Sequence, residues 1–218
     1  MLRLMQQGIR LALCVMMLSV TLPVVSMAQD EEASSTPPII LITGSNRGLG
    51  FEFAKQYTER GWTVIATCRK PESADDLQAL ASEYPNLIIE QLDVTDDAGI
   101  EALAEKYRGT PIDVLLNNAA VLGNQQDQRF GTFNYDMFES QYRINALGPM
   151  KITEAFIEHV EASDQKKVVF LASRAGSIGS IQPPANLYSY RASKMAVHLF
   201  AYNLSLELPE RGILVGIV

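Results

Sequence analysis

The sequence has few cysteines, few histidines and fewer basic than acidic side chains. Two cysteines and two histidines in 218 residues offer no cluster of Cys and His for a zinc site, and no metal is expected. The 18 Lys and Arg residues are outnumbered by 25 Asp and Glu, which gives a formal net charge of −7. Nucleic acids and anionic membranes are bound through clustered Lys and Arg, so this balance argues against broad binding to either. The remaining composition, 47% hydrophobic and 20% charged, is that of a globular protein of one domain.

Long hydrophobic runs are also scarce, and the most extended one lies near the N-terminus. Residues 11–25 carry no charge, follow Arg3 and Arg10, and precede a small-x-small pattern at residues 26–28. This pattern predicts a cleaved secretory signal over residues 1–28 and a polar linker over residues 29–38, hence export to the periplasm or the exterior. The run is shorter than the roughly 20 residues of a membrane span. A retained membrane anchor formed by residues 11–25 is the alternative.

After the linker, short apolar runs rich in β-branched residues alternate with helical patterns. The predicted strands cover residues 38–43, 63–68, 86–92, 112–117, 167–172 and 213–218. The predicted helices cover residues 48–60, 74–84, 97–107, 137–160 and 190–208. This alternation predicts an α/β domain over residues 39–218, with a doubly wound parallel sheet and helices on both faces. We therefore expect a three-layer Rossmann-type fold.

A glycine-rich loop follows the first predicted strand. Residues 43–50 read Thr-Gly-Ser-Asn-Arg-Gly-Leu-Gly and open the first predicted helix. Glycine lets the backbone come close to a pyrophosphate, and a helix N-terminus presents free N–H groups and the positive end of its dipole. The residues of this loop predicted to bind a cofactor are Gly44, Ser45, Asn46, Arg47, Gly48, Leu49 and Gly50.

The end of the second predicted strand favours NADP over NAD. NAD-binding domains usually place an Asp or Glu here to hold the ribose 2′-OH. This chain instead has Cys68, Arg69 and Lys70, and Arg47 lies in the glycine loop. Cations at these positions can pair with a 2′-phosphate, so NADP is the predicted cofactor and NAD is less favoured. The alternative is that Arg69 and Lys70 form a solvated turn before Pro71.

The side chains best suited to catalysis are concentrated between residues 173 and 194. Tyr190 and Lys194 are four residues apart in a predicted helix, so their side chains lie on one helix face. A nearby ammonium favours the tyrosinate, which lowers the tyrosine pKa and prepares the phenol to exchange a proton with a carbonyl oxygen. Ser173 follows the fifth predicted strand and can hold the same oxygen by a hydrogen bond. These three residues are the predicted catalytic group.

These motifs, in this order, resemble those of the short-chain dehydrogenase/reductase family. The loop at residues 43–50, the turn Asn117-Asn118-Ala119-Ala120 and the set Ser173, Tyr190 and Lys194 carry the resemblance, with Ala120 where the family usually has Gly. The resemblance implies a fourth catalytic residue, Asn145, which supports a proton relay. It gives Lys194 a second role, holding the nicotinamide ribose. The further cofactor contacts that it implies are Asp93, Val94, Asn118, Ala119, Tyr190 and Lys194.

A longer connection between Ser173 and Tyr190 gives a finer resemblance, to the sniffer and C-factor branch of carbonyl reductases. It implies an NADPH-dependent oxidoreductase (EC 1.1.1.-) that interconverts a small-molecule carbonyl and an alcohol. It also implies homo-oligomer contacts through the helices at 137–160 and 190–208. The alternative function is a non-catalytic NADP-binding sensor or interaction protein on the same fold. The predicted export favours this alternative, because NADPH is scarce outside the cytoplasm.

The length of the chain gives one more expectation. Members of the family normally continue past the sixth strand with a Pro-Gly turn, a substrate-covering helix and a seventh strand. Here the predicted strand at 213–218 comes last. We therefore expect the last part of the family fold to be missing, and residues 213–218 to be a hydrophobic sheet edge prone to association.

Overall fold

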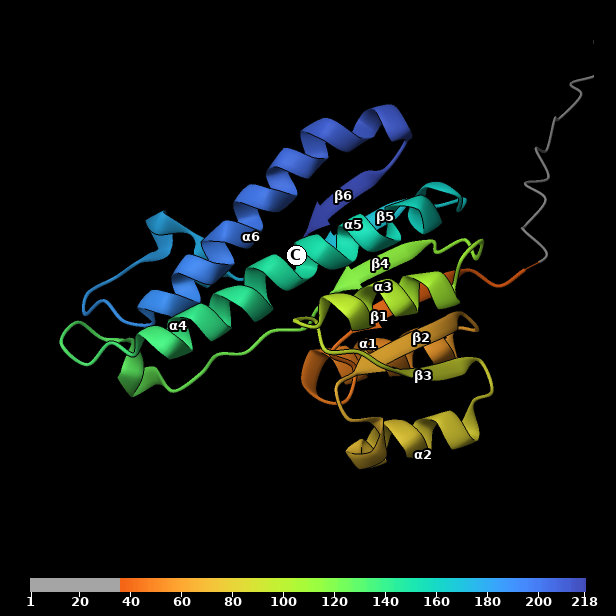
Figure 1. Ribbon diagram of the computed structural model, residues 1–218, viewed down its shortest axis with the longest axis horizontal. Helices are drawn as coiled ribbons and strands as arrows, with labels where there is room; N and C mark the ends of the chain where they lie inside the picture. The colour runs from red at the N-terminus through yellow and green to blue at the C-terminus, as the bar shows by residue number, and fades with distance from the viewer. Residues whose placement is uncertain (1–35) are drawn as a thin grey trace, which may run out of the picture. The chain divides into compact units, whose positions relative to one another are not determined.

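Strand β1 (Ile39–Thr43) lies between β2 (Thr63–Cys68) and β4 (Val114–Asn117) in the computed structural model, which describes residues 36–218 (Figure 1). The sheet has six strands in the order β3-β2-β1-β4-β5-β6, and every neighbouring pair is parallel. The remaining strands are β3 (Leu87–Gln91), β5 (Lys167–Phe170) and β6 (Leu214–Ile217). This is the strand order of the Rossmann fold, and it confirms the predicted doubly wound parallel sheet. The predicted signal and the anchor alternative lie outside the described residues.

The two faces of the sheet carry separate hydrophobic cores. On one face, Leu41 of β1 packs in a cluster with α3 (Asp97–Lys106), α5 (Gly148–Glu161) and α6 (Tyr188–Glu207). On the other face, Ile40 and Ile42 pack with α1 (Gly48–Glu59) and α2 (Asp75–Glu83). Successive side chains of a strand point to opposite faces, so one apolar strand serves both cores. In Figure 1, α2 and α6 lie at opposite ends of the domain.

The predicted helix at 137–160 is interrupted by a π-helical turn. The segment begins two residues earlier as α4 (Tyr135–Tyr142), widens into a π-helix at Arg143–Leu147, and continues as α5. The side chain of Asn134 caps its start by accepting a hydrogen bond from the Met137 N–H at 2.9 Å. The prediction of one regular helix was therefore wrong at its centre. Single-turn π-helices are frequent at functional sites, and this one contains Asn145.

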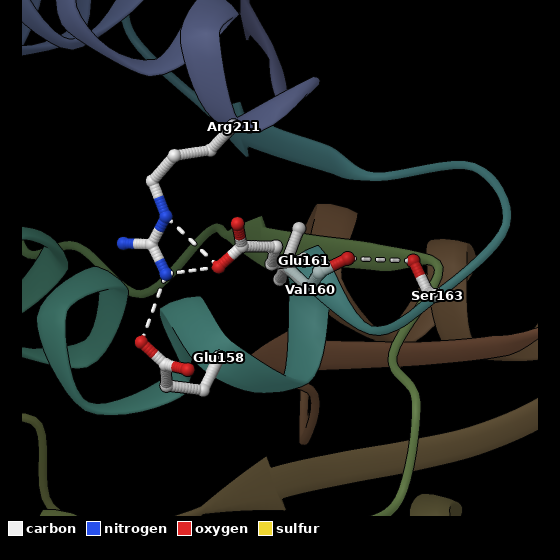
Figure 2. Close-up of polar contacts among 5 residues, drawn as sticks. All are labelled: Glu158, Val160, Glu161, Ser163 and Arg211. Carbon is white, nitrogen blue, oxygen red and sulfur yellow. Dashed lines mark hydrogen bonds and ion pairs between the residues drawn. The ribbon is translucent and has the colours of Figure 1, made fainter.

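A cluster of charged side chains fastens the turn before β6 to the end of α5. Arg211, in the turn Leu208–Arg211, donates from Nε to Glu161 Oε2 at 2.9 Å and from Nη2 to Glu158 Oε1 at 2.8 Å (Figure 2). The guanidinium holds the pKa of Glu161 below its ordinary value. The cluster fixes where the chain enters β6. Among residues 36–218, no helix is long and apolar enough to span a membrane.

Candidate active site

A cavity of about 380 Å³ opens at the carboxyl ends of β1, β2 and β4. The chain leaves β1 toward β2 on one side and enters β4 on the other, so this is the point where strand order reverses. Open parallel sheets bind ligands at such a point. The cavity is lined by Gly44, Asn46, Arg47, Gly48, Leu49, Gly50, Cys68, Arg69, Leu92, Asp93, Val94, Asn118, Ala119, Ala120, Val121 and Ile144.

The N-terminus of α1 faces this cavity without a side-chain cap. Arg47, at the N-cap position, makes no capping hydrogen bond with its side chain, and Gly48, Leu49 and Gly50 all line the cavity. A Cβ on Gly50 would stand 2.1 Å from the Gly44 carbonyl oxygen, so only glycine lets the loop close in this way. The first N–H groups of a helix have no partner within it, and they attract anions together with the helix dipole.

Hydrogen bonds from the turn that follows β4 hold the glycine loop in place. Thr43 Oγ1 accepts hydrogen bonds from the backbone N–H groups of Asn118 and Ala119, both at 3.0 Å. Asn118 Nδ2 donates in turn to the carbonyl oxygens of Thr43 at 2.8 Å and Gly44 at 3.0 Å. The turn after β4 therefore fixes the loop after β1, across 74 to 76 positions in the sequence.

Two predicted cofactor residues make local contacts of their own. Ser45 is fully buried: its Oγ donates to the Ile42 carbonyl at 2.9 Å and its N–H to the Thr67 carbonyl at 2.8 Å. It is the one residue of the predicted loop set that does not line the cavity. Asp93 lines the cavity, and its Oδ1 accepts from Thr95 N–H at 2.9 Å and Thr95 Oγ1 at 2.7 Å. These bonds fix the Asp93 carboxylate at the end of β3.

The three predicted cations at the glycine loop and the end of β2 separate into two groups. Arg47 and Arg69 both line the cavity, whereas Lys70 does not. Cys68 also lines the cavity, as a buried free thiol whose pKa is raised by burial. The positive charge at this wall therefore comes from Arg47 and Arg69.

Asn145 joins the cavity to α6. Its Oδ1 accepts from the Val121 N–H at 2.8 Å, and its Nδ2 donates to the Val121 carbonyl at 2.9 Å and to Ser193 Oγ at 3.0 Å. Val121 lines the cavity, and Ser193 precedes Lys194 on α6. The side chain is 1% exposed, so these contacts are screened little by water. Asn145 therefore ties the wall of the cavity to the predicted catalytic helix.

The three predicted catalytic residues, Ser173, Tyr190 and Lys194, are not among the residues that line the cavity. Lys194 is 3% exposed, its Nζ donates to the Leu171 carbonyl at 2.8 Å, and burial lowers its pKa to about 8. Ser173 Oγ, at the end of β5, accepts from the Ala175 N–H at 3.0 Å. A Cβ on Gly176 would stand 2.8 Å from the Lys194 carbonyl oxygen, so the turn after Ser173 packs directly on α6. No hydrogen bond joins the three side chains to one another among the described residues.

Sequence reasoning missed Gln128, which contacts the predicted catalytic helix. Gln128 is fully buried, and its Oε1 accepts from the Tyr190 N–H at 3.0 Å. It lies in a polar stretch after β4 that reads as an ordinary loop, so a single sequence carries no signal for it. Across residues 36–218, no group of three or more His, Cys, Asp or Glu side chains is placed to hold a metal ion.

The family model described as short chain dehydrogenase matches residues 38–218. An uncharacterized oxidoreductase of Schizosaccharomyces pombe is 33% identical over 191 residues, which cover 84% of this chain and 72% of that protein. The match thus covers more than two thirds of that relative.

Two solved structures are similar over most of the described domain. A short-chain dehydrogenase/reductase from Burkholderia multivorans with bound NADP is 31% identical, with a TM-score of 0.72 over 80% of this chain and 75% of that one. An NADPH-bound carbonyl reductase from chicken fatty liver is 29% identical, with a TM-score of 0.75 over 83% of this chain and 74% of that one.

The strand order, the glycine loop and the cavity at the switch point define a Rossmann-type domain. Within that class, the chain belongs to the short-chain dehydrogenase family and is an oxidoreductase of that type. The family resemblance predicted from the motifs is confirmed. The finer resemblance to the sniffer and C-factor branch stays a prediction.

Proposed function

We propose that the chain is an NADP(H)-dependent oxidoreductase that interconverts a carbonyl and an alcohol, with Tyr190 as the proton donor and acceptor. The observation that carries the proposal is the double hydrogen bond between Val121 and Asn145. Together with the Asn145–Ser193 bond, it joins the wall of the cavity to the helix that carries Tyr190 and Lys194.

The residues at the cavity fit a phosphorylated dinucleotide. The uncapped N-terminus of α1 offers N–H groups to a pyrophosphate, and Gly50 lets the loop close against the start of this helix. Arg47 and Arg69 line the same cavity and would hold a 2′-phosphate by charge-assisted hydrogen bonds. The two similar structures contain NADP and NADPH, which supports the same cofactor for this chain. When bound, this cofactor supplies or accepts the hydride.

The chain's own residues would move the proton. Tyr190 lies four residues before Lys194 on α6, so both side chains lie on one helix face, and the Tyr190 phenol would exchange the proton with the carbonyl oxygen. Ser173, at the end of β5, would hold the carbonyl oxygen by a hydrogen bond. Lys194 would in addition hold the ribose that carries the nicotinamide. Asn145, through its contact with Ser193, keeps this helix in place beside the cavity.

The test replaces Tyr190 by Phe and uses Tyr188→Phe as a matched control. Tyr188 is the first residue of α6 and is 44% exposed, with its ring 6.4 Å from that of Phe133. NADPH oxidation is measured with a panel of small aldehydes and quinones, and NADPH binding is measured by fluorescence. Y190F should lose turnover by about 10²-fold or more and keep its NADPH affinity, because acid–base catalysis contributes about 10²–10⁴-fold. Y188F should resemble the wild type.

Two outcomes would count against the proposal. Unchanged turnover in Y190F would remove Tyr190 from its role. Tight NADPH binding by the wild type, with no turnover on any member of the panel, would favour the sensor or interaction protein instead.

A further inference from the structure

Helix α6 begins at a residue that is poorly suited to start a helix. Leu187 occupies its N-cap position in the left-handed region, at φ 55° and ψ 37°, and makes no side-chain capping bond. Leucine has no oxygen to accept a hydrogen bond from the first N–H groups, and a bulky residue rarely adopts a positive φ. The catalytic helix therefore lacks a cap from its own sequence.

Gln128 supplies the missing cap from a distant part of the chain. Its Oε1 accepts from the N–H of Tyr190, the third residue of α6, at 3.0 Å and from Ser189 Oγ at 2.9 Å. An N-cap side chain normally accepts from the second or third N–H of its helix, so Gln128 takes that place from 62 residues away. The bond is made to the backbone of Tyr190 itself.

The other end of the same amide holds the loop beside the cavity. Gln128 Nε2 donates to the carbonyls of Leu122 at 2.7 Å and Asn124 at 3.3 Å. Leu122 follows Val121, which lines the cavity. Both donor hydrogens and the acceptor of this fully buried amide are thus used. One side chain sets the distance between the cavity loop and the start of α6.

We propose that Gln128 is a positioning residue for the reaction: it places Tyr190 relative to the cavity through the Tyr190 backbone. The inference rests on the proposed function and names one more residue of the same site. A displacement of about 1 Å at a reacting group lowers a rate by up to about 10²-fold. Loss of this bond should therefore reduce the rate of the chemical step more than it reduces cofactor binding.

The chain offers a matched control in Gln141. It is also a buried glutamine, and its Nε2 donates to the same Leu122 carbonyl. Its Oε1 has no partner, and within the described residues it makes no hydrogen bond to α6. Gln141→Met removes from α4 a buried amide that contacts the same loop, and it leaves the start of α6 capped.

The experiment compares Gln128→Met, Gln128→Glu and Gln141→Met with the wild type in NADPH-dependent reduction of the aldehyde and quinone panel. Q128M should lower kcat by about 10- to 100-fold with little change in the KM for NADPH. Q128E retains an acceptor for the Tyr190 N–H but loses the donor to the Leu122 and Asn124 carbonyls, so its kcat should also stay well below that of the wild type. Q141M should keep a kcat close to that of the wild type, even where its thermal stability falls.

Amide hydrogen exchange provides a readout that does not depend on turnover. Exchange at residues 188–190 should be faster in Q128M than in Q141M, since only the former uncaps α6. Equal exchange at these residues, or an equal loss of kcat in the two variants, would overturn the inference. A wild type without turnover would instead contradict the proposed function, and the exchange comparison would still decide whether Gln128 caps the helix.

Should Q128M fail to fold, Gln128→Asn takes its place in both measurements. It keeps the amide but is shorter by one methylene, so it cannot reach Leu122 and Tyr190 together. A kcat well below that of Q141M supports the inference, and a kcat equal to it overturns it.

Discussion

Asn145 and Ser193 are joined by a hydrogen bond of 3.0 Å between Nδ2 and Oγ, across 48 positions in the sequence. Ser193 Oγ in turn donates a hydrogen bond to the Tyr190 carbonyl at 2.8 Å. Through its remaining bonds to Val121, Asn145 completes a chain of contacts from the cavity to the helix of Tyr190. The π-helical turn that carries Asn145 is therefore stabilised by tertiary bonds as well as by its own backbone.

Substitution of Asn145 should cost more stability than substitution of Ser193. Asn145→Leu leaves both backbone groups of Val121 without their partner and should lower the free energy of unfolding by about 1–3 kcal/mol. Ser193→Ala removes one hydroxyl and should cost about 1 kcal/mol or less. Urea unfolding of the two variants beside the wild type measures the difference. Equal losses would show that the Val121 contacts contribute nothing.

Replacement of Lys194 by an uncharged residue should remove activity and raise the free energy of unfolding at neutral pH. Burial holds the folded-state pKa of Lys194 at about 8, below its ordinary value of 10.5. Between these two values the unfolded chain binds more protons, so the free energy of unfolding of the wild type should rise with pH across this window. Below it, the folded protein bears the cost of a buried charge.

Lys194→Met removes that charge. At pH 7 it should be more stable than the wild type by roughly 1–3 kcal/mol, should lose the rise with pH, and should have little or no turnover. Chemical denaturation over a pH series measures the first two, and NADPH oxidation measures the third. A variant less stable than the wild type at pH 7 would contradict the burial argument.

Arg69 and Lys70 should differ in their effect on cofactor choice, although they are adjacent in sequence. Arg69 lines the cavity and Lys70 does not. Arg69→Ala should weaken NADPH binding by about 10- to 100-fold, the value of one charge-assisted contact, and should change NADH binding little. Lys70→Ala should leave both affinities near those of the wild type.

Fluorescence titration with each nucleotide gives the four dissociation constants. Equal weakening of NADPH and NADH in Arg69→Ala would mean that the side chain does not face the 2′-position. A larger effect in Lys70→Ala would reverse the assignment of the two cations.

The strands could be predicted from the sequence because their signal is local. All six begin and end within two residues of the predicted bounds. The central strands β1, β2 and β4 are short runs buried along almost their whole length. The π-helical turn could not be predicted, since its backbone depends on bonds from Asn145 to Val121 and Ser193. Regular periodicity at 137–160 favours one α-helix and carries no trace of those bonds.

The site residues that belong to a sequence motif could be predicted. Those whose role depends on contacts between distant parts of the chain could not. The glycine loop identifies the residues around the cavity, but it does not reveal that Ser45 turns into the core, because neighbours in a tight loop point in different directions. Gln128 is hidden for a different reason. Its role exists only once β4 and α6 are in place, and nothing in its local sequence marks it.

The hydrogen bonds between Asn118 and Thr43, which shape the glycine loop, affect when this loop can form during synthesis of the chain. During synthesis the loop, α1 and β2 emerge long before Asn118, so the early chain has the glycine sequence without the bonds that shape it. Competence to bind a nucleotide thus arrives late, when β4 has paired beside β1. A ligand that binds only the folded loop does not bind incompletely synthesised chains, so it stabilises the native state alone.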